Sequence, residues 1–227
     1  MKWNNKFTYP KSTRSIVNGS RHYNLDGSNL PSVTTILKAT QSEEDKAGIA
    51  AWKERVGHKE AERIKNEASN RGSSMHSYIE QFLLGKFNLD LLDEDNKSKK
   101  MAVEIIDNGL KNKLSEIWGT EATVYYPGKY AGTADCICIY EGKETILDFK
   151  QSNKPKKQEF ILDYLLQGSG YSLAHNTVYN SRITQVAILI CTVDGLFQDF
   201  KIEGNELINF QNQFLEKVEQ FYHQLRK

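Results

Sequence analysis

Residues 132–152, GTADCICIYEGKETILDFKQS, contain two apolar runs separated by a Glu-Gly turn, a pattern that predicts a β-hairpin. Residues i and i+2 of a strand point to the same face, so Asp148 and Lys150 lie side by side while Leu147 and Phe149 point away from them. The charged pair has two interpretations. It is either a solvated pair at the edge of a sheet or part of a functional site.

A second acidic residue, Asp135, lies in the strand that precedes the turn. Antiparallel pairing is expected to place Asp135 at the end of its strand and Asp148 near the partnering end of the next. Two neighbouring carboxylates repel each other unless a cation lies between them, and Mg²⁺ prefers carboxylate oxygens. Lys150 could then steer a metal-bound water and neutralise charge on a phosphate, which is phosphodiester-hydrolysis chemistry. The alternative is a salt-bridged hairpin end.

Hydrophobic periodicity, turn signals and helix caps predict the other elements. Strands are expected over 121–128, 131–140, 143–151, 183–193 and 196–203. Helices are expected over 33–39, 43–56, 58–69, 72–84, 97–113, 158–176 and 205–225, the first two capped by Ser32 and Ser42. Residues 1–30 are predicted to form short strands and turns, with an Asp-Gly turn at Asp26.

The order β-β-β-α-β-β-α in the second half predicts a mixed sheet flanked by helices, an α/β fold. Residues 31–115 form a mainly helical region and residues 116–227 the core with the sheet, together one compact domain. The chain of 227 residues, 39% hydrophobic and 11% aromatic, is long enough for a sizeable core. Its formal net charge of +1 does not indicate a nucleic-acid partner, so local patches must.

Three cysteines provide no disulfide framework. Cys136 and Cys138 share a strand face, so we expect them to pack as small apolar side chains rather than bind zinc. The N-terminus has neither a secretory signal nor a mitochondrial presequence, and no apolar run is long enough to span a membrane. The expected setting is the cytoplasm, of a bacterium or a phage-infected host.

Two helices carry polar pairs at i,i+4 spacing, which share one helix face. His76 and Glu80 form the first pair, as either a solvated ion pair or a metal or phosphate ligand with its neighbour. Gln167 and Tyr171 form the second, within an apolar helix. The glycines Gly168 and Gly170 lower helix propensity, which indicates close approach of a packed neighbour or a nucleic-acid backbone.

Taken together, these motifs resemble the PD-(D/E)xK nuclease superfamily, and within it the RecB-like exonucleases. The family's acidic residue, strand Asp, (D/E)xK strand and Q-x-x-x-Y helix correspond to Glu121, Asp135, Asp148-Phe149-Lys150 and Gln167-Gly-Ser-Gly-Tyr171, and its upstream His corresponds to His76. The stretches LPSVTTILKAT, WKERV, RGSSMHSYIE, GTADCICIY, ILDFKQSNKPK and LLQGSGYSLA are similar, in order, to mitochondrial genome maintenance exonucleases and their phage and bacterial relatives. The similarity begins near residue 30.

The resemblance implies a Mg²⁺- or Mn²⁺-dependent DNA exonuclease that prefers single-stranded or flapped DNA with a free end. It implies that Asp135, Asp148 and His76 bind metal, that Lys150 positions the attacking water, and that Gln167 and Tyr171 hold the phosphate backbone. Glu121 has the least motif context, and Glu80 is a candidate for orienting His76. Some relatives bind an iron–sulfur cluster through four cysteines at fixed places. This chain has three cysteines, two of them on one strand, so we expect no iron–sulfur cluster.

The resemblance also implies an arch in the helical region, through which a single strand passes. The segment from Ser42 to Asn70 is rich in basic residues around Trp52, including Lys53 and Arg55, although glutamates are interleaved. The alternative is a solvated helix pair with ordinary charge mixing. Ser152 and Lys154, just after the (D/E)xK strand, complete the set of expected DNA contacts.

Two other classes of function remain open. One is an enzyme of the same fold on another substrate, namely a double-strand exonuclease for recombination or an endonuclease. The other is an inactive relative that binds nucleic acid or inhibits a nuclease. For the leading interpretation, the expected partner is DNA, preferentially single-stranded, in DNA repair or recombination. A recombination or replication protein is a candidate partner, and no membrane is expected.

Overall fold

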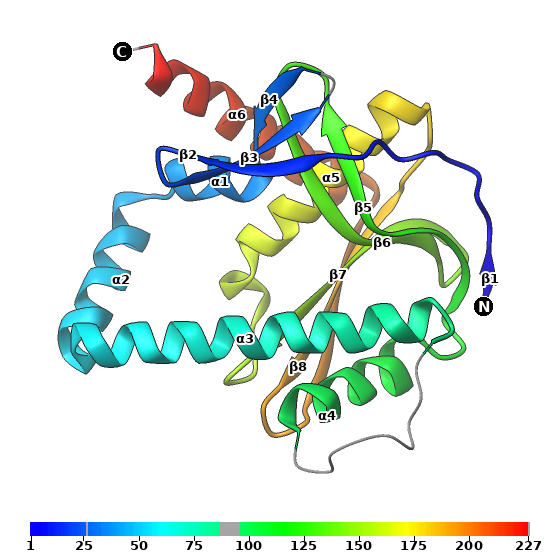
Figure 1. Ribbon diagram of the computed structural model, residues 1–227, viewed down its shortest axis with the longest axis horizontal. Helices are drawn as coiled ribbons and strands as arrows, with labels where there is room; N and C mark the ends of the chain where they lie inside the picture. The colour runs from blue at the N-terminus through cyan, green and yellow to red at the C-terminus, as the bar shows by residue number, and fades with distance from the viewer. Residues whose placement is uncertain (26, 87–95, 227) are drawn as a thin grey trace.

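The computed structural model describes residues 1–25, 27–86 and 96–226, so the turn predicted at Asp26 lies partly outside the described residues. A mixed six-stranded sheet forms the centre of the molecule, with helices on both of its faces (Figure 1). The predicted fold class is therefore confirmed. Within the described ranges, no helix combines the length and the apolar character needed to cross a membrane.

The main sheet has the strand order β1-β5-β6-β7-β8-β9, with β7 and β8 at its parallel centre. Its strands are β1 Lys2–Trp3, β5 Leu114–Tyr126, β6 Tyr130–Tyr140, β7 Lys143–Ser152, β8 Gln185–Thr192 and β9 Phe197–Glu203. β8 is buried along its whole length, as expected for a strand covered on both faces. The predicted hairpin between β6 and β7 is present, since the two strands pair in antiparallel register up to Tyr140 and Lys143.

Two apolar clusters cover the two faces of this sheet. One cluster packs α1, α5 and α6 against the sheet, and the other packs α3 and α4 against the opposite face. The helices are α1 Val33–Ala39, α2 Glu43–Val56, α3 His58–Leu83, α4 Lys97–Glu104, α5 Leu162–Tyr179 and α6 Gly204–Leu225. Cys136 and Cys138 lie buried in the second cluster, so their predicted apolar packing is confirmed, and Cys191 joins them.

The helix caps follow the sequence closely at the beginning of the helical region. The Ser32 hydroxyl accepts a hydrogen bond from the Thr35 N–H, and the Ser42 hydroxyl accepts one from Asp45, which satisfies free N–H groups in the first turns of α1 and α2. Helix α2 ends at Gly57, whose φ of +86° suits glycine.

The prediction of separate helices over 58–69 and 72–84 is wrong, because α3 is one continuous helix. A glycine inside a helix costs about 1 kcal/mol, and the burial of Met75, Ile79 and Leu83 in the following turns outweighs that cost at Gly72. The helix predicted to 113 also ends early. After α4 the chain makes a wider π-helical segment, Ile105–Leu110, and β5 then begins at Leu114, seven residues before its predicted start.

Helix α2 has no buried residue, and the first half of α3 buries only Ala61. Figure 1 shows α2 at the left edge of the molecule, where it joins α1 to the beginning of α3. This helical pair therefore extends away from the two apolar clusters, and packing holds α3 chiefly through its C-terminal turns.

A second, three-stranded sheet of β2 Thr13–Val17, β3 Ser20–Leu25 and β4 Ser28–Pro31 precedes α1. Tyr23, Leu25 and Leu30 pack with Ala131 of β6 in a small cluster of their own. The N-terminal residues, which the sequence motifs do not cover, therefore lie directly against one of the strands of the central sheet.

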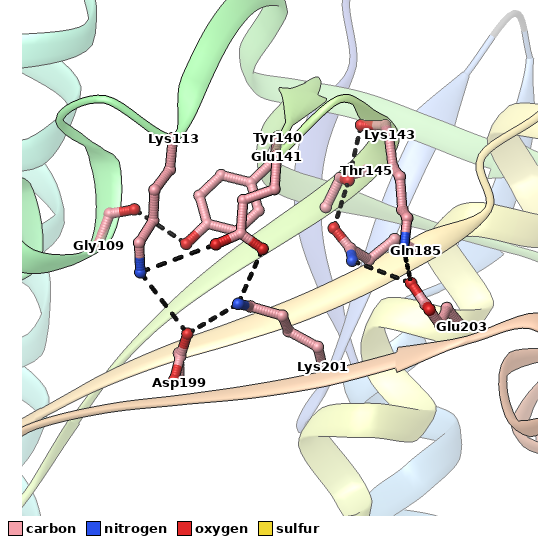
Figure 2. A network of polar contacts seen from close by, with 10 residues as sticks. All are labelled: Gly109, Lys113, Tyr140, Glu141, Lys143, Thr145, Gln185, Asp199, Lys201 and Glu203. Carbon is pink, nitrogen blue, oxygen red and sulfur yellow. Dashed lines mark hydrogen bonds and ion pairs between the residues drawn. The ribbon is translucent and has the colours of Figure 1, made fainter.

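At the turn that joins β6 to β7, a network of polar contacts connects neighbouring strands of the main sheet (Figure 2). Lys113 and Lys201 each contact both Glu141 and Asp199, which closes a ring of four alternating charges. Each of these partly buried pairs lies near the surface and is worth little alone, but the ring links the start of β5, the β6–β7 turn and β9. It fixes the end of the hairpin that lies away from Asp135.

Candidate active site

Three neighbouring strands bring three carboxylates to one place in the sheet. Thr120 and Ala122 of β5 pair with Cys136 and Ala134 of β6, which places Glu121 opposite Asp135. The β6–β7 register then brings Asp148 next to Asp135. The prediction that Asp135 ends its strand is wrong, because β6 continues on both sides of it. Only the pairing with β7 stops before Asp135, whereas the pairing of β6 with β5 continues past it to Tyr130.

The backbone between β6 and β7 opens at this place. The ladder runs from Tyr140 and Lys143 to Cys136 and Leu147, and at the next position the Asp135 carboxylate accepts the Phe149 N–H at 2.8 Å. A side chain thus replaces a backbone acceptor, which fixes the carboxylate and separates the strands.

The backbone of Phe149 also orients His76 on α3. The His76 Nε2 lies 2.7 Å from the Phe149 carbonyl oxygen, which can only accept a hydrogen bond, so Nε2 carries the proton. In the neutral ring the other nitrogen, Nδ1, carries the lone pair, and it lies 3.6 Å from Asp135 Oδ2. Either a proton on Nδ1 or a metal ion between the two atoms satisfies both of them. The backbone of Phe149, rather than Glu80, is the partner that orients the ring.

His76, Glu121 and Asp135 place ligand atoms within 4.8 Å of one another, which makes them a candidate metal-binding group. Glu121 lines the cavity and is the exposed member of the group; the partial burial of its carboxyl in the cavity, together with the nearby Asp135, raises its pKa to about 7. Its φ of +46° is in the left-handed region, an unusual and strained conformation for glutamate. The local backbone therefore directs this carboxylate toward Asp135 at an energetic cost.

Asp148 lies beneath this group, fully buried, and forms an ion pair with Lys150. The interpretation as a solvated edge pair is wrong, because β7 runs between β6 and β8. Burial raises the pKa of Asp148 although the Lys150 ammonium opposes the shift. Neither carboxylate oxygen accepts a hydrogen bond of regular geometry from the described residues, so both retain free lone pairs.

Lys150 projects from β7 into the cavity, 5.1 Å from the centre of the Tyr164 ring. Burial disfavours its charge, but Asp148 and Asp135 outweigh burial and raise the pKa of Lys150. The ammonium is therefore held charged at the floor of the site.

Helix α5 contributes the predicted amide and phenol. The Gln167 Nε2 donates to the Tyr171 hydroxyl at 3.0 Å, and both side chains line the same cavity. The Tyr171 ring lies against Gly132 of β6, where an added Cβ would come 2.3 Å from the ring. A Cβ at Gly168 or Gly170 would meet Val186 or Phe214, so these two glycines allow close packing of protein neighbours, one of the two predicted reasons.

One cavity of about 460 Å³ is lined by His76, Glu121, Asp135, Lys150, Gln167 and Tyr171, whereas the predicted metal ligand Asp148 is buried and does not line it. Its walls also contain residues that the motifs did not single out, from the second sheet, α1, α3 and β6: Arg14, Arg21, Tyr23, Ser32, Thr34, Gly72, Ser73, Ser77 and Thr133. Glu80 lines it too. The two arginines could have been found only with the packing of the second sheet known, because a strand pattern alone does not reveal which of its faces meets the cavity.

The other expected DNA contacts lie outside this cavity. Trp52, Lys53 and Arg55 are on α2, away from its lining residues, with Trp52 half-buried and the two basic residues exposed. Lys154 and Ser152 line a separate cavity of about 350 Å³ that Tyr164 also borders. The Ser152 hydroxyl is engaged within its own loop, since it donates to the Lys154 carbonyl at 2.6 Å.

A mixed sheet with a (D/E)xK strand at its centre, and a Q-x-x-x-Y helix over the same cavity, is the class of fold and site that the resemblance to the PD-(D/E)xK superfamily implies. No family model matches the chain. Comparison with curated proteins does find relatives of this chain. The chain is 29% identical over 174 residues to mitochondrial genome maintenance exonuclease 1 of Homo sapiens, an alignment of 73% of this chain and 50% of the relative. It is 25% identical over 214 residues to the Xenopus tropicalis protein, covering 89% and 60%.

The resemblance predicted from the motifs is thus confirmed, and the chain spans between one half and 60% of the length of these two relatives. Among solved structures, a candidate exonuclease from Eubacterium rectale has a TM-score of 0.44 at 17% identity, covering 66% of this chain and 64% of that one. An alkaline exonuclease from Laribacter hongkongensis has a TM-score of 0.33 at 11% identity, covering 66% and 81%.

Proposed function

We propose that this chain is a metal-dependent nuclease that hydrolyses DNA phosphodiester bonds as an exonuclease, with a preference for single strands that have a free end. The observation that carries the proposal is the cavity in which His76, Glu121 and Asp135 converge beside the buried Asp148–Lys150 pair. The names of the curated relatives, exonucleases of mitochondrial genome maintenance, agree with it.

The donor set fits a divalent cation, Mg²⁺ or Mn²⁺. Two carboxylates and the Nδ1 side of an imidazole face one another, and the Asp148 carboxylate, paired with Lys150, is buried nearby with lone pairs to spare. His76, Glu121 and Asp135 would hold the ion, and Asp148 would face it from the sheet. A bound divalent ion supplies charge to a phosphoryl oxygen and lowers the pKa of a coordinated water.

The side chains of the protein then have separate tasks. The Lys150 ammonium, oriented by Asp148, is placed to hold a water and to stabilise negative charge on a reacting phosphate. The Gln167 amide and the Tyr171 hydroxyl, which are hydrogen-bonded to each other, can donate to phosphate oxygens from α5. Phe149 keeps His76 and Asp135 in place through its own N–H and carbonyl.

The preference for a free single strand rests on the helical pair of α2 and the first half of α3. It has almost no buried residues, carries basic side chains, and continues directly into the half of α3 that carries His76. We infer that it forms an arch through which one strand is threaded, with Trp52 offering a stacking surface.

The test compares substrates that differ only in topology. Single strands labelled at the 5′ or the 3′ end, a circular single strand and a blunt duplex are incubated with Mg²⁺ or Mn²⁺ and, separately, with a chelator. We expect digestion of the linear single strands only, and only with metal. Rapid cutting of the circle would indicate an endonuclease, and preferential digestion of the duplex would indicate a double-strand exonuclease. No cleavage of any DNA would leave the inactive binding relative.

Trp52→Ala tests the arch itself. Loss of one stacked base should weaken single-strand binding by about 1–3 kcal/mol. Ile49→Ala, on the same exposed helix and 44% exposed, is the matched control and should bind normally. Equal binding by both variants and the wild-type chain would remove Trp52 from the binding surface.

A further inference from the structure

The N-terminal sheet presents two arginines to the cavity, from a part of the chain that no motif covers. In the β2–β3 pair, Arg14 lies opposite Tyr23, and Ile16 lies opposite Arg21. Alternate residues of paired strands share a face, so these four side chains lie on one face of the hairpin. Three of them, the two arginines and Tyr23, line the cavity that contains Asp135.

Arg14 is held in place by two contacts. Its Nη2 donates to the Thr133 hydroxyl at 2.9 Å, and its guanidinium lies 5.7 Å from the centre of the Tyr23 ring. The Tyr23 hydroxyl, 3.1 Å from the same Thr133 oxygen, completes the arrangement. Thr133 is two residues before Asp135 on β6, so the guanidinium is attached to the strand that carries the central carboxylate. Most of its N–H donors remain available.

Neither arginine is paired with any of the acidic residues that share the cavity with it. Glu80, Glu121 and Asp135 share the cavity, yet among the residues that the structure describes neither arginine has a carboxylate within 4.0 Å. An arginine fork matches the oxygens of a phosphate as well as those of a carboxylate. These two forks are therefore free to bind an anion that enters the cavity from outside.

We propose that Arg14 and Arg21 form a phosphate clamp that binds the backbone of a DNA single strand beside the cleaved bond. Glu121, Asp135 and Lys150 come to the cavity from the successive strands β5, β6 and β7, and the two guanidinium groups come from the N-terminal sheet. A polyanionic strand is attracted to the guanidinium and ammonium groups, while the carboxylates attract cations. Ile16, 69% exposed on the same face, offers an apolar contact to a sugar or base. The proposal rests on the proposed function, because it takes DNA as the substrate.

The experiment measures binding of a labelled single-stranded DNA oligonucleotide by fluorescence anisotropy over a series of NaCl concentrations. The Asp148→Asn background and a chelator keep the strand intact. Arg14→Gln and Arg21→Gln should each weaken binding about tenfold and lower the slope of log K against log[salt] by about 0.7, the value for one phosphate contact on a single strand. Arg14→Lys should retain the slope but recover only part of the affinity, because an ammonium has no fork.

Arg182→Gln is the matched control. Arg182 is an exposed arginine in the loop between α5 and β8. Its backbone N–H donates to the Glu144 carboxylate near the start of β7, at the other end of that strand from Lys150, and Arg182→Gln keeps this hydrogen bond. It should bind DNA as the parent does. In the cleaving enzyme, the two clamp variants should raise KM more than they lower kcat, since the clamp holds DNA without touching the reacting atoms.

The possible failures are distinguishable. If the wild-type chain cleaves DNA and the double variant Arg14→Gln/Arg21→Gln binds it with unchanged affinity and salt slope, the clamp is wrong and the proposed function stands. If the wild-type chain neither binds nor cleaves any DNA, the proposed function fails and the clamp fails with it. A double variant with the melting temperature of the parent and reduced affinity supports the clamp.

Discussion

Asp148 combines two properties that conflict in a residue kept only for stability. It is fully buried, and burial raises its pKa even with Lys150 in contact. A carboxyl whose pKa is raised in the fold destabilises the folded state when it is ionised, because the unfolded chain ionises more easily. The charge is therefore better explained by chemistry than by packing.

We predict that Asp148→Asn lowers DNA cleavage at least about 100-fold without lowering the melting temperature. The amide has the same shape and removes a charge that is costly to bury, while Asp135 remains as a counter-charge for Lys150. Cleavage rates and thermal unfolding at pH 7 check both halves. Asp107→Asn, in the exposed pair with Lys111, serves as the control and should change neither quantity appreciably. Normal cleavage by Asp148→Asn would contradict the assignment.

For single residues, the sequence predicts which face of a strand a side chain occupies better than it predicts how deeply that side chain is buried. The period of two placed Asp148 beside Lys150 and away from Phe149, as observed. The burial of Asp148 could not be predicted, because it depends on β8 pairing beside β7, far along the chain. Nor could the positive φ of Glu121, which brings it into the group with His76 and Asp135.

Helix α5 and strand β6 are in close contact at the wall of the cavity. The Tyr171 ring lies on Gly132, and the hydroxyl of that ring accepts the Gln167 amide. The absence of a side chain at Gly132 therefore sets the position of a residue on a different element.

We predict that Gly132→Ala displaces the Tyr171 ring and reduces DNA cleavage, with a loss of stability of about 1–3 kcal/mol from overpacking. Cleavage kinetics and urea unfolding give the two quantities. Gly168→Ala and Gly170→Ala are matched controls, because their added methyl groups meet Val186 and Phe214 instead of a residue of the cavity wall. They should lower stability by a similar amount and leave the activity per folded molecule nearly intact. If all three variants lose activity in proportion to stability, Gly132 has no special relation to the site.

The boundaries of elements were predicted less well than their existence. Ser32 and Ser42 marked the beginnings of α1 and α2 because capping is a local interaction. Gly72 was expected to separate two helices, but distant packing of Met75 and Ile79 overrides the local signal. The early start of β5 likewise depends on pairing with β6 across irregular positions near Gly119, which no local pattern shows.

At the scale of the whole molecule, the N-terminal segment is held to the core through His175. This buried residue of α5 lies among Phe7, Tyr9 and Tyr179, and its Nε2 is 3.1 Å from the Tyr9 hydroxyl. Burial, with a smaller contribution from Lys6, lowers the pKa of His175 from 6.5 to about 4. The ring is therefore neutral in the folded protein at neutral pH.

We predict a loss of stability of about 3 kcal/mol from His175 as the pH falls from 6.5 to 4. The unfolded chain takes up a proton near pH 6.5 and the folded chain only near 4, so the contribution is complete above 6.5 and declines between the two values. Urea unfolding at several pH values measures it. His175→Phe should flatten the curve in this window, whereas His58→Gln, at an exposed position, should not. An unchanged curve for His175→Phe would show that the imidazole does not titrate as described.

The continuous helix α3 has a consequence for motion. Its last turns bury Met75, Ile79 and Leu83, whereas its first half buries only Ala61 and its neighbour α2 buries nothing. Backbone amides exchange with solvent deuterium through local opening where few apolar contacts hold them, and through global unfolding where many do. One unbroken helix should thus contain a fast-exchanging half and a protected half.

Mass-spectrometric deuterium uptake should be rapid for residues 43–70 and slow for 75–83. Binding of a single strand should slow uptake in the first segment and leave the second unchanged, because only the first has stability to gain. Uniform protection along α3 in the free protein would mean that the whole helix opens as one unit. The N-terminal half, which buries only Ala61, would then owe its stability to the packing of the C-terminal turns.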